Sequence, residues 1–148
     1  MSPVARVGGR VLLVDPADRV LLIHERLEDG STHWLTPGGG VEGAESPRVA
    51  AEREAFEEVG IRVELGDAAP ALVTQRLWSW AGIVYDQADF FYLARVPAQD
   101  ALTPGGLTDV EQTTLLGHRW WTVAELQATT EVILPADLGD ILAKLLTR

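Results

Sequence analysis

The sequence predicts an α+β fold, an α/β/α sandwich with a central mixed β-sheet. Three observations lead to this prediction. Strand-like apolar runs interleave irregularly with helical segments, one segment carries clear helix start and stop signals, and no repeated strand–helix–strand unit is present. The 148 residues are enough for one well-filled core, so we expect a single domain over residues 1–148.

A hairpin and a glycine-rich turn are predicted near the N-terminus. Apolar residues indicate two strands joined at an Asp-Pro-Ala-Asp turn. Two adjacent glycines in the first strand indicate a bulge or a close backbone approach. The predicted segments are a strand over 6–14 with Gly8 and Gly9, a turn over 15–18, a strand over 19–23, a polar loop over 27–33 and the glycine-rich turn over 37–40.

A helix is predicted over residues 47–59. Ser46 is a favoured N-cap, and Pro47 is a favoured first helical residue because an N–H at that position would have no partner. Gly60 suits the left-handed conformation that commonly ends a helix. The apolar residues of this helix share one broad arc, which only Glu52 interrupts, so we expect that face to pack.

The second half of the chain reads as further strands, one long loop and two helices. The Thr122-x-x-Glu125 pair is a capping box that opens a short helix. The other predicted segments are strands over 61–65, 72–80 and 84–96, a loop over 97–108, a short strand over 118–121 and an amphipathic helix over 135–146.

Composition argues against several classes of function. The net charge of −10 disfavours a binding surface for polymeric nucleic acid. No apolar run approaches the ~18 residues of a membrane span, and no signal-like stretch opens the chain, so we expect a cytoplasmic protein without membrane association. The absence of cysteine excludes disulfides and thiolate metal sites.

Three carboxylates share the second face of the predicted helix. Glu54, Glu57 and Glu58 fall within an arc of about 100°, where they repel one another unless a cation lies between them. Taken alone, such a cluster is more often a solvated helix face. Here it follows a glycine-rich turn, and together they suggest a divalent metal held against a phosphate chain.

The same window matches a known motif. The pattern is G-x5-E-x7-R-E-U-x-E-E-x-G-U, where U is apolar, and its fixed positions are met by Gly39, Glu45, Arg53, Glu54, Ala55, Glu57, Glu58, Gly60 and Ile61. This pattern is the Nudix box, and the chain resembles the Nudix hydrolases. The resemblance implies the Nudix fold and the hydrolysis of a nucleoside diphosphate linked to a moiety X, with Mg²⁺ or Mn²⁺ as cofactor.

The resemblance also implies roles for the residues of the box. Glu57 and Glu58 are expected to bind metal, and Glu54 is expected to bind metal or to orient the attacking water. The backbone carbonyl of Gly39 is expected to add an oxygen ligand. Arg53 is expected to hold a box glutamate in place through an ion pair.

Three further residues have expected roles around this core. Nudix enzymes often add an acidic residue from a later loop, and Glu111 is the candidate, with an exposed loop charge as the alternative. Glu45 is expected to support the loop and helix or to reach the metal through water. Gly60 is expected to be structural.

Candidates for substrate binding lie outside the box. Trp34 either stacks a base or packs in the core. Arg76 and Trp78, on one face of a predicted strand, either contact a phosphate and a base or only pack within the sheet. Gln87 and Asp89 precede an apolar run and are assigned to the cleft.

The expected substrate is a small (deoxy)nucleoside di- or triphosphate, including oxidised forms. The approach to the box, Trp34-Leu35-Thr36-Pro37-Gly38-Gly39, resembles that of small nucleoside-triphosphate pyrophosphohydrolases. ADP-ribose or nucleotide-sugar hydrolysis and a non-catalytic nucleotide-sensing module are the alternatives. An isomerase is disfavoured because its chemistry would need cysteine. The expected partner is a small nucleotide derivative, bound by a monomer or a homodimer.

Overall fold

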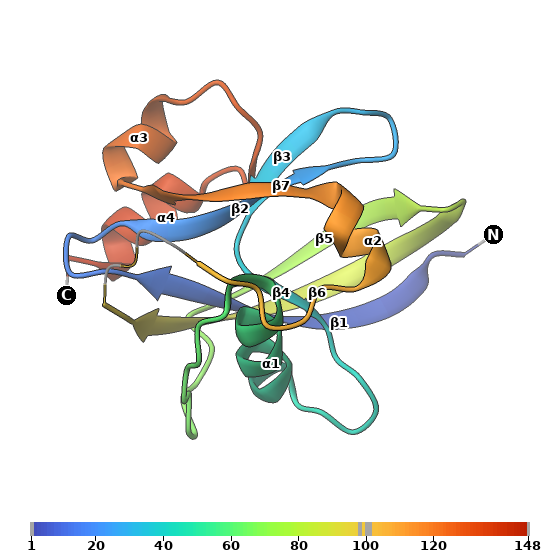
Figure 1. The fold of residues 1–148 in the computed structure, drawn as a ribbon, viewed down its shortest axis with the longest axis horizontal. Helices are drawn as coiled ribbons and strands as arrows, with labels where there is room; N and C mark the ends of the chain where they lie inside the picture. The colour runs from blue at the N-terminus through green and yellow to red at the C-terminus, as the bar shows by residue number, and fades with distance from the viewer. Residues whose placement is uncertain (1, 98, 100–101, 148) are drawn as a thin grey trace. The chain divides into compact units, whose positions relative to one another are not determined.

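The computed structural model describes residues 2–97, 99 and 102–147 (Figure 1). These residues divide into two compact units. The first unit comprises residues 2–11, 37–94 and 102–106, and the second comprises residues 12–36, 95–97, 99 and 107–147. Strand β1 (Val4–Val14) begins in the first unit and ends in the second. That the whole chain is a single domain stays a prediction.

The first unit combines strands with one long helix. Strands β5 and β6 form an antiparallel hairpin that turns at Ala81 and Gly82, both of which have positive φ angles. The hydrogen-bonded order is β5-β6-β1, and β4 pairs antiparallel with β1. The predicted hairpin strands are therefore confirmed. The elements that join β1 here are β4 (Gly38–Gly40), α1 (Pro47–Val59), β5 (Leu72–Trp80) and β6 (Ile83–Arg95).

Helix α1 has the predicted bounds because local signals set both ends. The Ser46 hydroxyl accepts the N–H of Val49 at 3.2 Å, and Gly60 adopts a left-handed φ of 74°. Helix and sheet touch at Gly9, where an added Cβ would overlap the carbonyl oxygen of Pro47. The predicted close approach in β1 is thus a contact between backbones, and it brings α1 close to the strand.

The strand predicted over residues 61–65 is wrong. These residues form no strand, and the N–H of Leu65 donates to the Glu52 carboxylate at 2.7 Å instead of joining a ladder. The same bond explains why Glu52 interrupts the apolar arc of α1. The Glu52 side chain here accepts the backbone hydrogen bond that a neighbouring strand would otherwise accept.

The end of α1 is closed by a segment far along the chain. The last carbonyls of a helix have no partner inside the helix. The N–H groups of Gly105 and Gly106 donate to the carbonyls of Phe56 and Glu57 at 2.9 and 3.1 Å. A side chain at Gly105 would overlap the Phe56 ring. The predicted long loop therefore holds the last turn of the glutamate-bearing helix.

The second unit has a mixed sheet of short strands. β2 pairs antiparallel with β3 and β7, and β8 runs parallel to β3. Its buried residues include Leu13, Leu21, Trp121 and Leu142. The elements are β2 (Val20–Arg26), β3 (Thr32–Leu35), α2 (Asp109–Thr114), β7 (Leu115–Trp121), α3 (Val123–Ala128), β8 (Ile133–Leu134) and α4 (Leu138–Leu145).

Two helices of this unit begin with a capping box; α3 was predicted and α2 was not. Both bonds of the Thr122–Glu125 capping box are present and open α3, as predicted. The same signature, Thr108-x-x-Glu111, opens α2 directly after the predicted loop, in a segment where no helix was predicted. The last helix begins at Leu138 rather than at residue 135, because residues 133–134 pair with β3.

Among the described residues, no helix combines the length and the apolar character needed to cross a membrane.

The contact at Gly9 gives a test of the packing of α1. Gly9→Ala should lower the free energy of unfolding by about 1–3 kcal/mol or more, because the methyl group would force α1 away from β1. Gly106→Ala is the matched control, since its Cβ would meet only the Glu57 side chain at 3.9 Å. Urea denaturation of both variants measures the difference. Equal stability of the two would contradict the packing described here.

Candidate metal and phosphate site

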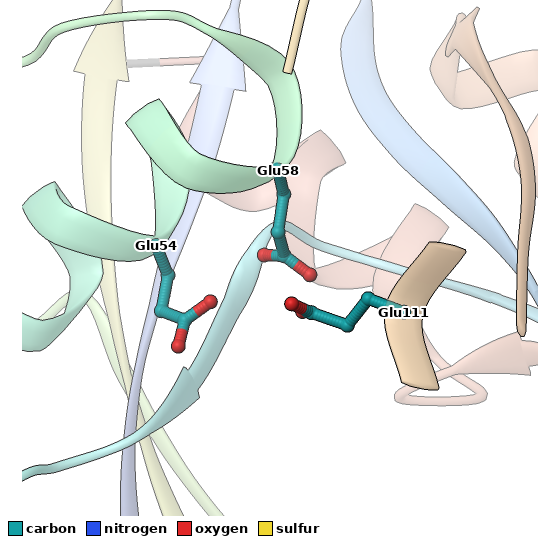
Figure 2. Close-up of side chains that lie close together, drawn as sticks. All are labelled: Glu54, Glu58 and Glu111. Atoms are coloured by element: carbon teal, nitrogen blue, oxygen red, sulfur yellow. The ribbon is translucent and has the colours of Figure 1, made fainter. Parts of the chain in front are cut away.

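Two of the predicted metal ligands project from one side of α1. Glu54 and Glu58 are four residues apart, and a carboxylate oxygen of one lies within 4.8 Å of one of the other. Figure 2 shows both side chains leaving α1, and it shows Glu111 leaving α2. Glu54 is buried and Glu58 is half-buried. Hard oxygen donors at this spacing are the ligands that Mg²⁺ prefers.

Strand β4 lies directly against these carboxylates. The N–H of Gly38 donates to Glu58 Oε1 at 2.8 Å. A Cβ at Gly39 would lie 2.6 Å from Glu54 Oε1, so only a glycine fits there without displacing that side chain. The segment predicted as a glycine-rich turn is a short strand, and its lack of side chains gives the backbone close access to the glutamates.

Strand alternation decides which backbone groups of β4 face α1. The carbonyl of Pro37 and the N–H of Val41 bond to β1, whereas the N–H of Gly38 and the carbonyl of Gly40 bond to side chains of α1. In an antiparallel pair, both backbone groups of one residue point the same way. The carbonyl of Gly39 accordingly lies beside β1, 3.1 Å from a Cβ built at Gly8. Gly39 as a carbonyl ligand stays a prediction, and this pattern favours Gly38.

Arg53 connects the acidic groups. Its Nε and Nη2 atoms donate to the two oxygens of Glu45 at 2.8 and 3.0 Å. Its Nη1 donates to Glu54 at 3.0 Å and to Glu57 at 3.1 Å. Nη2 also donates to the carbonyl of Gly40 at 3.1 Å. One guanidinium thus links the loop, the helix and β4.

The hydrogen bonds between Arg53 and Glu45 stabilise the charged forms of both side chains. Hydrogen bonding to Glu45, more than the nearby charge of Glu54, raises the pKa of Arg53 above its ordinary range. The hydrogen bond from Arg53 lowers the pKa of Glu45 in turn. Both groups are therefore charged at neutral pH. Glu45 lies where it can support the loop and the helix, which was one of its two predicted roles.

Glu111 belongs to the second unit. Its carboxylate accepts the N–H of Thr108 at 2.9 Å and completes the capping box of α2. It is half-buried and lies on a short helix, not on an irregular loop. Its role as a metal ligand stays a prediction.

The predicted substrate-binding residues of the first unit form a chain of contacts. The indole N–H of Trp78 donates to Gln87 Oε1 at 2.7 Å, and Gln87 Nε2 donates to Asp89 Oδ1 at 2.6 Å. Arg76 Nε donates to Asp89 Oδ2 at 3.3 Å. The structure therefore brings Arg76, Trp78 and Gln87 together on one face of the β5–β6 hairpin.

Asp89 is the buried centre of that chain. It is 1% exposed, and Arg10 Nε lies 3.3 Å from its Oδ2. Burial raises the pKa of Asp89, but the charges of Arg10 and Arg76 and the bond from Gln87 outweigh it, so the net shift is downward. Asp89 is therefore an ionised carboxylate that two arginines hold beneath the sheet surface.

Trp34 occupies a different setting. It is 9% exposed, its ring stacks on His24 with centroids 4.2 Å apart, and its N–H donates to Glu131 at 3.1 Å. This geometry favours packing in the core of the second unit over base stacking.

Comparison with known proteins shows the family of this chain. The NUDIX domain profile matches residues 5–142. This chain belongs to the Nudix hydrolase family. The box predicted from Gly39 to Ile61 lies within the matched region.

Relatives in sequence include two kinds of Nudix enzyme. An RNA pyrophosphohydrolase from Rhodopseudomonas palustris (strain BisB18) is 32% identical over 116 residues, which cover 70% of this chain and 63% of that protein. Diphosphoinositol polyphosphate phosphohydrolase 2 from Rattus norvegicus is 48% identical over 50 residues, which cover 33% of this chain and 26% of that protein. The chain thus spans less than two thirds of the length of these relatives.

Solved structures share the fold. The MutT protein from Methanosarcina mazei Go1 matches with a TM-score of 0.68 at 17% identity, over 99% of this chain and 96% of that one. The E. coli dihydroneopterin triphosphate pyrophosphohydrolase matches with a TM-score of 0.67 at 20% identity, over 98% and 99% of the two chains. The predicted α+β Nudix fold with a mixed β-sheet is therefore confirmed.

The ionised state of Asp89 predicts a pH-dependent contribution to stability. Because its pKa in the folded protein lies below the ordinary 3.8, the carboxylate stabilises the fold above that pH. The contribution is lost as the pH falls through the folded-state pKa. Asp89→Asn should lower the free energy of unfolding at pH 7 by about 3 kcal/mol, because it leaves a buried arginine without its anion.

Urea denaturation of wild type and variant between pH 7 and pH 2.5 measures this effect. The difference between them should be constant near neutrality and should shrink in acid. Asp86→Asn, at an exposed position on the same strand, is the control and should stay close to wild type throughout. A gap between wild type and Asp89→Asn that widens in acid would contradict the assignment.

Proposed function

We propose that this chain is a Mg²⁺-dependent pyrophosphohydrolase, able to use Mn²⁺, that cleaves a nucleoside diphosphate linked to a moiety X. The observation that carries the proposal is the intact set of box glutamates, which Arg53 and the glycines of β4 hold in one place. A nucleotide-sensing module without activity would not need all three carboxylates.

Each residue of the site has a distinct part in this mechanism. Glu57 and Glu58 are metal ligands, and Glu54 is a ligand or the base that orients the attacking water. When bound, the metal would neutralise the pyrophosphate and lower the pKa of that water. The N–H of Gly38 fixes the Glu58 carboxylate, and Arg53 holds Glu54 and Glu57.

Two further oxygen ligands complete the proposed set. The carbonyl of Gly38, not that of Gly39, is the backbone ligand, because the backbone groups of Gly38 point toward α1. Glu111 is the additional acidic ligand. Replacing Glu111 with Gln would then weaken Mg²⁺ binding without affecting the box glutamates.

The proposed substrate is a small nucleoside di- or triphosphate or an oxidised nucleotide. The similarity to the E. coli dihydroneopterin triphosphate pyrophosphohydrolase supports a triphosphate. ADP-ribose or a nucleotide sugar is the alternative, since the Nudix domain of Shewanella oneidensis NrtR, which binds ADP ribose, shares the fold with a TM-score of 0.65. A cytoplasmic location and a monomeric or homodimeric state remain predictions.

Loss of a single carboxylate tests the reaction. Glu57→Gln and Glu58→Gln should each lower kcat/KM by roughly 10²–10³-fold, because each removes several kcal/mol of metal-assisted stabilisation of the transition state. Glu64→Gln is the control, since this glutamate is exposed and lies outside α1. Release of phosphate and of nucleotide products is measured over nucleoside triphosphates, oxidised deoxynucleotides, nucleotide sugars and ADP-ribose, with Mg²⁺ or Mn²⁺.

Reaction in H₂¹⁸O then identifies the phosphorus that is attacked. Unchanged turnover in both glutamine variants would refute the assigned roles. Nucleotide binding without any product across the whole panel would favour the sensing module instead.

A further inference from the structure

A cation that the box does not contain lies beside it in the first unit. Arg6 is half-buried on β1, and a Cβ at Gly40 would lie 2.5 Å from its Nη2. Gly40 also accepts a hydrogen bond from Arg53 through its carbonyl. Arg6 is therefore packed against the glycine strand that contacts the glutamates.

Two stacked aromatic rings hold the Arg6 guanidinium. Trp78 and Tyr85 are cross-strand neighbours whose centroids are 4.7 Å apart at 26°. The Cζ of Arg6 lies 5.4 Å from the Trp78 ring and 5.7 Å from the Tyr85 ring. Such cation–π contacts position a guanidinium without neutralising its charge.

A second guanidinium approaches the same ring. The Cζ of Arg76 also lies 5.4 Å from the Trp78 ring. Arg76 has an ionic partner in Asp89 at 3.3 Å. Among the residues that the structure describes, Arg6 has no carboxylate within ion-pair distance. In a chain of net charge −10, this half-buried cation without an anion is unusual.

Arg6 and the glutamates both contact strand β4, on different faces. Successive residues of a strand point to opposite faces. Gly39 faces the Glu54 carboxylate and Gly40 faces the Arg6 guanidinium, so the acidic and basic groups lie on opposite faces of β4. The two groups meet at Gly40, which faces the Arg6 guanidinium and whose carbonyl accepts a bond from Arg53, the residue that holds Glu54 and Glu57. Arg6 has the planar fork suited to phosphate.

We propose that Arg6 is a specificity-determining residue that binds a phosphate of the substrate beyond the pyrophosphate held at the glutamates. The inference rests on the proposed function and refines it: the site favours chains of three or more phosphates over diphosphates. The phosphate supplies the anion that Arg6 lacks, while Trp78 and Tyr85 fix the direction of the guanidinium.

Binding of inorganic phosphate chains tests this proposal without knowledge of X. Dissociation constants for pyrophosphate and tripolyphosphate are measured by calorimetry in Ca²⁺, and ³¹P NMR verifies that each probe stays intact. Wild type should bind tripolyphosphate about tenfold or more tightly than pyrophosphate, the worth of one charge-assisted hydrogen bond. Arg6→Gln should remove that preference and leave pyrophosphate binding within about twofold.

Two further variants separate recognition from folding and from net charge. Arg6→Lys keeps the charge but loses the fork, so it should retain an intermediate preference. Arg62→Gln makes the same change in charge at an exposed arginine that also lies over a ring, 4.0 Å from Phe56, and should keep the full preference. Because selectivity is a ratio of two affinities, a merely structural role of Arg6 would not change it.

The outcomes distinguish this inference from the proposed function. An unchanged ratio in Arg6→Gln, or an equal loss for both probes, overturns the role of Arg6 and leaves the hydrolase proposal intact. Failure of wild type to bind pyrophosphate with any divalent cation counts against the proposed function. If wild type fails to bind pyrophosphate but binds tripolyphosphate through Arg6, the anion site at Arg6 is still supported. If wild type binds neither probe, the role of Arg6 and the proposed function are both refuted.

Discussion

Repulsion among carboxylates is the constraint on which this site depends. Three glutamates of α1 and Glu45 of the preceding loop converge in a protein that already carries a net charge of −10. Arg53 lies among them, bonds to Glu45, Glu54 and Glu57, and reaches the backbone of β4. Without that cation the helix face would repel itself. The same side chain therefore links the loop, the second half of the helix and the glycine strand.

Much of the fold was predictable from the sequence where local chemistry decides structure. Capping residues set both ends of α1, and alternation set the hairpin of β5 and β6. Short strands escaped prediction because two to four residues are too few to show a period. The strand expected over residues 61–65 failed because a helix side chain, Glu52, satisfies the backbone there, and that contact has no local signature.

The candidate site was predictable in its acidic part and not in its basic part. The box residues lie within one stretch of chain, so their spacing alone brings them together on a helix. Asp89 lies on β6, and only the pairing of β6 with β1 and β5 brings Arg10 and Arg76 to it. Alternation along β1 would have placed Arg6 on the same face as Arg10, but nothing local indicates which strand that face meets.

Strand β4 consists of three glycines, so charged side chains of other elements can approach its backbone closely from both faces. Side chains of other elements cover its two faces: the guanidinium of Arg6 and the aliphatic part of Arg10 lie on one face, and the carboxylate of Glu54 lies on the other. The strand is therefore a spacer one peptide thick between the Arg6 guanidinium and the Glu54 carboxylate. The field at the motif is then set in part by arginines upstream of it, so two chains with identical boxes can present different fields to the same ligand.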